Sequence, residues 1–427
     1  MLDTEKPASF FIEEIANYLD FLSSSRLVAG VQCCTICPFR HPPSQNMYMA
    51  EEALLVVLEG LRRFPNLRSL NLRKVTLSVD TINALRRLDV SILDLQSSVE
   101  HCIDQPMFEN RLPLRDFIFD RNMPFSSNQL SASALSLFLN PDTLKSFFGA
   151  QFRAENILVA LARSPRPFVA LRLLHIGVDV MSQEGLIPAL AQCPAIEKVC
   201  LHQQLWDLTH CDAPEETLPG DVLPNLTCYE GSHTFATFFC KHHSLRRVAL
   251  KPSRPMSPKF DDPESICACL GCLGPRVESL DIPGGTLMTE HLLSTISTSF
   301  PELRRLSINC YPYYTEPFSR PPQVQHALSE AVLPAGLEEI NLGVKIEDDY
   351  PKRDVLAHVK LCGQACPGLR IVRIRYGRYP LSKSIVWRRS TMLAEYQKTG
   401  VMQPRIEQLR VEPICMAGSP TPCSDNL

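Results

Sequence analysis

Short apolar–polar alternations recur along the chain, each led by an apolar residue three positions earlier. In the clearest copy, Leu303, Leu306 and Ile308 form a Leu-x-x-Leu-x-Leu phrase, and near copies occupy residues 64–72 and 366–374. Successive side chains of a strand point to opposite faces. The last two apolar residues of each phrase are therefore predicted to share one face of a short strand.

The phrase recurs at intervals of 19 to 34 residues, and helical patterns lie between the copies. Residues 50–63 carry apolar residues on one helical face, and Thr289 is a plausible N-cap for a second such helix. A single strand cannot bury its apolar face alone, so stacked neighbours are expected to share one core. The first apolar position of the phrase falls at residues 67, 90, 114, 144, 171, 196, 226, 245, 277, 303, 337 and 369.

These strand phrases, each reached by a helix of irregular length, resemble those of leucine-rich repeat proteins, and more narrowly the F-box/leucine-rich-repeat-like proteins abundant in fungi. The resemblance covers about residues 50–375. It implies an α/β solenoid with a curved parallel sheet on the concave side and helices on the convex side. In that family an F-box docks a Skp1-type adaptor and the repeats hold the target. No F-box is found here, so such an adaptor is expected only if an F-box lies upstream.

The pattern divides the chain into four expected segments. In the first segment, Phe10–Phe21 predicts a helix and Arg26–Gln32 predicts a first strand. The expected segments are an N-terminal capping helix and first strand at 1–49, the solenoid at 50–375, a C-terminal cap at 376–416, and a disordered tail at 417–427.

Composition restricts the partners and the compartment. The 427 residues include 43 Lys and Arg and 46 Asp and Glu, for a net charge of −3, which argues against binding driven by nucleic-acid phosphates. There is no apolar run long enough for a membrane span and no signal-peptide pattern. The 17 cysteines are scattered through apolar positions. We therefore expect a reduced, cytoplasmic or nuclear protein without nucleic-acid or membrane partners.

Two cysteine clusters are the candidates for chemistry. Cys34, Cys37 and His41 are residue types that bind metals and are closely spaced, and a second cluster spans Cys267–Cys272. Zinc needs four ligands, and no second pair follows at finger spacing, so buried thiols are the preferred interpretation. Nucleotide-binding and hydrolase motifs are also missing. We expect no catalytic residue, metal or cofactor; a metal-dependent enzyme using these segments is the alternative.

The candidate binding residues lie on the open face of the predicted sheet. The third and fifth residues of each phrase point away from the core, and a tyrosine-rich loop supplies the aromatic side chains that interfaces favour. The candidates on the sheet are Arg247, Asp281, Arg305, Glu339 and Arg373, and those in the loop are Tyr311, Tyr313 and Tyr314.

The second position of five successive phrases alternates in charge. Parallel neighbours there are close enough to interact, so the row is either a mixed-charge docking surface or a set of charges that satisfy one another. The residues are Arg246, Glu278, Arg304, Glu338 and Arg370. Together these features predict a non-enzymatic protein-interaction scaffold. The resemblance to F-box/leucine-rich-repeat-like proteins implies a substrate-recognition subunit of an SCF-type ubiquitin ligase. The alternative is a free-standing repeat adaptor unrelated to ubiquitin.

Overall fold

The chain folds into two compact units. The first comprises residues 1–212 and 221–226, and the second comprises residues 213–220 and 227–427. The computed structural model describes residues 8–24, 28–37, 49–96, 99–100, 111–119, 130–149, 154–178, 183–203, 217–239, 245–251, 263–282, 288–309, 321–330, 332–343, 359, 361–363, 366, 368–376, 383–388 and 410–413.

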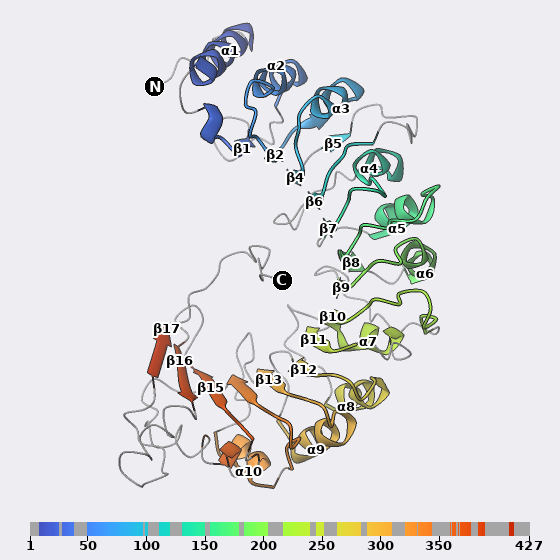
Figure 1. Cartoon of the computed structure of the whole chain (residues 1–427), viewed down its shortest axis with the longest axis vertical. Coiled ribbons are helices and arrows are strands. Elements are labelled where there is room, and N and C mark those ends of the chain that lie inside the picture. The colour runs from blue at the N-terminus through green and yellow to red at the C-terminus, as the bar shows by residue number, and fades with distance from the viewer. Residues whose placement is uncertain are drawn as a thin grey trace. The chain divides into compact units, whose positions relative to one another are not determined.

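The first unit is built on a parallel sheet with strand order β1-β2-β4-β6-β7-β8-β9. Its helices all lie on one side of this sheet (Figure 1). The strands are β1 Cys33–Ile36, β2 Ser69–Arg73, β4 Ile92–Gln96, β6 Asp116–Phe119, β7 Ser146–Gly149, β8 Leu173–Val178 and β9 Lys198–Gln203, and a separate pair is formed by β3 Thr76–Leu77 and β5 Val99–Glu100. The helices are α1 Ala8–Ser24, α2 Glu51–Leu61, α3 Val79–Arg86, α4 Ala132–Phe138, α5 Ala154–Ala162 and α6 Gln183–Ala191.

The second unit repeats this arrangement and then reverses direction. Strands β10 to β15 are parallel, whereas β16 and β17 add to the sheet in antiparallel pairs. The strands are β10 Cys228–Ser232, β11 Arg247–Lys251, β12 Ser279–Ile282, β13 Arg305–Asn309, β14 Glu339–Gly343, β15 Ile371–Tyr376, β16 Lys383–Arg388 and β17 Arg410–Pro413. The helices are α7 His233–Ala236, α8 Pro263–Cys272, α9 Glu290–Ser299 and α10 Pro321–Glu330, and a 3-10 turn, η4 Thr237–Phe239, follows α7.

The twelve predicted phrases are all strands, and each strand begins two residues after the first apolar position of its phrase. The core positions are buried as expected: Leu70, Leu280, Leu306 and Ile340 are at most 1% exposed. Burying one such side chain stabilises the fold by roughly 1.5–3 kcal/mol. Repeated strand–helix units, in-register parallel strands and helices on a single side are the architecture of a leucine-rich-repeat solenoid. The predicted α/β fold is confirmed.

The helices begin where the sequence provides caps. The Thr289 hydroxyl accepts a hydrogen bond from the Leu292 backbone N–H at 3.1 Å, as its position before α9 predicts. Ser78 caps α3 in the same way by accepting from Thr81 N–H at 3.2 Å. These caps satisfy backbone donors that the first helical turn leaves without an intrahelical partner.

The first strand is not where the sequence predicts it. Residues 28–30 form a 3-10 turn, and the strand is β1, in which Cys34 and Ile36 lie opposite Leu70 and Leu72 of β2. The prediction for 26–32 is wrong because the run Leu-Val-Ala does not alternate, whereas the stretch from Cys33 does. The helix predicted at Phe10–Phe21 is confirmed as α1.

Helix α1 lies very close to α2. A β-carbon placed on Gly60 of α2 would stand 2.6 Å from Cδ1 of Leu19, which is buried in α1. The glycine is therefore needed for this approach of the two helices.

The C-terminal segments are described only in part. Strands β16 and β17 lie within the predicted cap at 376–416, and the tail at 417–427 lies outside the described residues. The boundaries at 49, 375 and 416 stay predictions. In the part of the chain that the structure describes, no helix combines the length and the apolar character that crossing a membrane requires.

Candidate protein-binding surface

The face of the sheet opposite the helices, called the sheet face below, carries the third and fifth residues of each phrase. In β12 the buried Leu280 and Ile282 alternate with Ser279, which is part-exposed, and with Asp281, which is exposed. The same alternation in the neighbouring strands lines up side chains in rows, because the strands pair in register. The rows on the sheet face are therefore set by strand pairing rather than by loops.

The five predicted sheet residues lie on five consecutive strands, β11 to β15. Three of them form a cluster: the Glu339 carboxylate receives Arg373 Nη1 at 2.7 Å and lies 3.8 Å from Arg305 Nε. Glu339 is only 14% exposed, whereas Arg305 is 68% exposed. Arg247 and Asp281 lie on β11 and β12, outside this cluster.

The alternating row at the second position forms ion pairs between neighbouring strands. Arg246 contacts Glu278, and Glu338 lies between two arginines, 3.7 Å from Arg304 and 3.8 Å from Arg370. All of these side chains are at least 36% exposed, so each pair contributes at most about 1 kcal/mol. The contacts position the arginines more than they stabilise the fold.

Tyr311, Tyr313 and Tyr314 lie outside the described residues, so their place at a binding surface stays a prediction. Cys200 is the fifth residue of the phrase that begins at residue 196, a position that the pattern assigns to the open face, but it is only 2% exposed. It lies in register with His175 of β8, and a short side chain beside a larger one is shielded from solvent.

The first unit carries an apolar patch on its sheet face that the sequence analysis missed. The patch consists of Ile118, Phe148, Leu173 and His175, all part-exposed. Strand pairing places Ile118 beside Phe148 and Phe148 beside His175, with the Phe148 and His175 ring centroids 5.5 Å apart. The available signal was in β6 and β7, which read Asp-Phe-Ile-Phe and Ser-Phe-Phe-Gly and so place apolar residues on both faces.

The cysteine clusters are only partly packed into the fold: Cys34 is part-buried, whereas Cys33 and Cys37 are exposed. On α8, Cys267 and Cys269 are buried and Cys272 is exposed. On β1, burial raises the pKa of Cys34, and neighbouring Cys33 raises it further, which disfavours the thiolate that binds metals. His41 lies outside the described residues. Among the residues that are described, no three His, Cys, Asp or Glu side chains are grouped to hold a metal ion.

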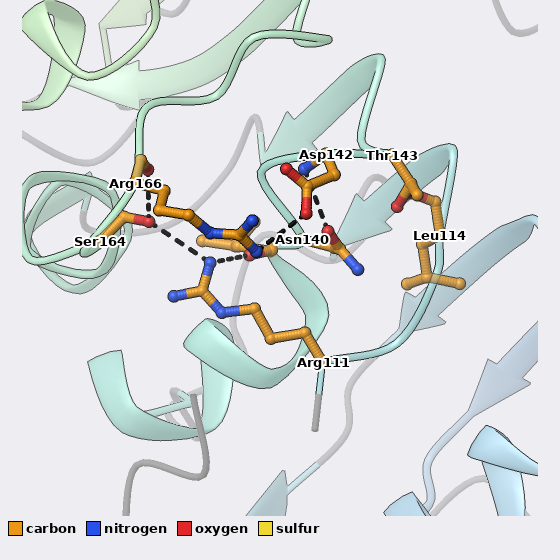
Figure 2. A network of polar contacts seen from close by, with 8 residues as sticks. Arg111, Leu114, Asn140, Asp142, Thr143, Ser164 and Arg166 are labelled. Atoms are coloured by element: carbon orange, nitrogen blue, oxygen red, sulfur yellow. Dashed lines mark hydrogen bonds and ion pairs between the residues drawn. The ribbon is translucent and has the colours of Figure 1, made fainter. Parts of the chain in front are cut away.

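A polar network joins three successive repeats of the first unit (Figure 2). Arg111 Nη1 donates to the Leu139 carbonyl at 2.8 Å, just after α4, and to Ser164 Oγ at 3.3 Å. Ser164 donates to the Arg166 carbonyl at 2.8 Å, and Arg166 forms a 2.8 Å ion pair with Asp142. Burial lowers the pKa of Arg111, Arg166 lowers it further, and Asp142 opposes both. The network holds repeat ends together.

Replacing Arg111 with Ala is expected to lower the free energy of unfolding by roughly 1–3 kcal/mol, because the part-buried Leu139 carbonyl loses a charged donor. The matched Arg166→Ala change removes an exposed ion pair and should cost less than about 1 kcal/mol. Urea denaturation followed by circular dichroism measures both. Equal losses in the two variants would contradict a structural role for Arg111.

No protein-family model and no curated protein sequence matches the chain. Among solved structures, it is similar to the leucine-rich repeat-containing protein LegL7 from Legionella pneumophila. The two share 13% sequence identity over 81% of this chain and 91% of that chain, with a TM-score of 0.42. The fold assignment rests on the strand register and the buried phrase positions described above.

Proposed function

We propose that the chain is a non-enzymatic protein-binding scaffold that receives its partner on the sheet face. The apolar patch carries this proposal. Phe148, Ile118 and Leu173 lie on neighbouring strands, and each leaves part of its apolar side chain open to solvent. Apolar side chains gathered on one exposed face are a mark of interaction sites.

The organisation of the sheet face supports the same proposal. Strand pairing places Phe148 beside His175 in the first unit, and a 2.7 Å ion pair holds Arg373 against Glu339 in the second. Side chains held in place lose little freedom on binding, which favours affinity. Aromatic and arginine side chains are also the residues that contribute most at protein interfaces.

The experiment compares three tagged baits in affinity purification with quantitative mass spectrometry: the wild type, Phe148→Ala and Val169→Ala. Val169 is 56% exposed and precedes β8, so it is a control outside the sheet face of the same unit. Partners recovered with the wild type should fall at least tenfold with Phe148→Ala and persist with Val169→Ala. Circular dichroism serves as the control that both variants are folded. Recovery that does not differ between the two variants would contradict the proposal.

A narrower version makes the chain a substrate-recognition subunit of an SCF-type ubiquitin ligase. Its support is the resemblance of the repeat phrase to F-box/leucine-rich-repeat-like proteins. This version requires that a Skp1-type adaptor copurify with the protein. Recovery of sheet-face partners without any such adaptor would leave the free-standing scaffold and remove the ligase role.

A further inference from the structure

The sheet face at β11 to β15, taken together with the residue just before each strand, is basic, although the chain as a whole has more acidic than basic residues. The second position of each phrase directly precedes its strand, the third and fifth lie on it, and together these positions hold six arginines and four carboxylates. The arginines are Arg246, Arg247, Arg304, Arg305, Arg370 and Arg373, and the carboxylates are Glu278, Asp281, Glu338 and Glu339. The local charge is therefore opposite in sign to that of the protein.

The arginines retain hydrogen-bonding capacity. Glu338 and Glu339 are each shared by two arginines, and three of these four contacts are 3.7–3.8 Å long. Among the described residues, Arg247 forms no ion pair and is exposed. A guanidinium has five N–H donors, so these contacts leave donors for incoming carboxylates.

The charges form stripes along the strands. Counting the residue just before each strand together with the strand, arginine pairs belong to β11 and β13, acidic pairs to β12 and β14, and two further arginines to β15. Adjacent strands lie ~4.8 Å apart, which separates successive basic strands by roughly 9.6 Å. A polyproline II segment advances roughly 9.3 Å in each three-residue turn, so every third side chain returns to the same side. The two spacings agree.

The burial of Glu339 favours this match. Glu339 is recessed between its two arginines, at 14% exposure, so it presents little charge to an incoming chain. A ligand with a carboxylate at every third residue places its charges over the basic strands. Its neutral residues then cross β12 and β14.

We propose that the sheet face of the second unit binds an acidic protein segment in polyproline II conformation, with a Glu or Asp at every third residue. This inference rests on the proposed function, since it names the partner that the sheet face receives. Charge complementarity selects the occupant, and the stripe spacing selects its periodicity. Carboxylates engage the guanidinium groups of Arg247, Arg305 and Arg373.

The test uses a fluorescein-labelled (Glu-Pro-Pro)4 peptide and fluorescence anisotropy with the full chain at low salt. Two control peptides are (Lys-Pro-Pro)4 and a peptide of the same composition with its four glutamates in one block. We expect the periodic acidic peptide to bind at least tenfold more tightly than either control. Its affinity should fall as salt is raised.

The matched protein variants are Arg247→Glu with Arg305→Glu on the sheet face, and Arg163→Glu after α5 in the first unit as the charge control. The double variant should weaken peptide binding at least tenfold, and Arg163→Glu should leave it unchanged. Arg247→Glu alone, which breaks no ion pair between described residues, should weaken binding at least threefold. That variant preserves the test if the double variant fails to fold.

Two results would overturn the acidic-segment proposal. One is equal affinity for the periodic peptide and for the peptide with its glutamates in one block. The other is a twelve-residue oligothymidine that binds more tightly than the periodic peptide. Cellular partners that still depend on Phe148 would then leave the scaffold function intact. Loss of that dependence on Phe148, with peptide binding retained, would instead reject the apolar patch as the carrier of the proposed function. The two failures are therefore distinguishable.

Discussion

Phe147→Ala is expected to lower the free energy of unfolding of the first unit by roughly 3–5 kcal/mol, the usual cost of removing a fully buried aromatic side chain. Phe147 has no exposed surface, and its ring centroid lies 5.6 Å from that of Phe117. Domains are typically stable by only about 5–15 kcal/mol, so this change removes a large share of the total. Urea denaturation monitored by circular dichroism, with hydrogen exchange to locate the loss, measures it.

The adjacent residue provides the control. Phe148 points to the opposite face of β7, and Phe148→Ala should cost only about 0.5–1.5 kcal/mol, mainly through the lost ring contact with His175. The same chemical change one residue apart should thus affect stability in one case and partner binding in the other. Similar losses of stability at both positions would show that β7 does not alternate as described.

Alkaline pH is expected to destabilise the protein through buried thiols. Burial raises the pKa of Cys193, of Cys269 and of Cys362, the last to about 12, whereas the ordinary value is 9.0. Below pH 9 each thiol keeps its proton in both the folded and unfolded states, and stability is unaffected. Above it the unfolded chain binds fewer protons, so the free energy of unfolding falls by about 1.4 kcal/mol per thiol for each pH unit.

The measurement is urea denaturation between pH 8 and pH 11. The control is a variant with Cys193, Cys269 and Cys362 replaced by Ala. It is less stable at pH 8 because of the lost packing, but its stability should decline less steeply as pH rises. Lysine and tyrosine ionisation affects both proteins alike and cancels in the comparison. Parallel declines would mean that these thiols are not protonated in the folded protein at alkaline pH.

The strand positions could be predicted from the sequence because the signal is local. Alternating apolar residues such as Leu306 and Ile308 can be buried together only on a strand, and a helix must return the chain to the next one. Prediction fails where the local signal is ambiguous. The apolar run at 26–32 contains a 3-10 turn, and β1 follows it. The antiparallel strands β16 and β17 depend on pairing with distant residues, which no local pattern encodes.

The candidate surface could be predicted only in part. Periodicity gives the strand face that Arg305, Glu339 and Arg373 share, but the sharing of Glu339 by two arginines depends on side-chain geometry. The phrase that begins at residue 144 assigns Phe147 to the core, and strand register agrees by placing Phe147 beside Phe117. The apolar patch was missed because it forms only when Ile118, Phe148 and His175 of three paired strands are brought together, which no single phrase shows.

The reversal of strand direction after β15 has an evolutionary consequence. A strand–helix repeat duplicated anywhere between β10 and β15 would find parallel neighbours on both sides and could be accommodated without redesign. A copy inserted next to β16 would meet an antiparallel strand and would need a different connection. Lengthening by tandem duplication in this unit is therefore confined to the stretch before β16, and relatives should differ in repeat number there.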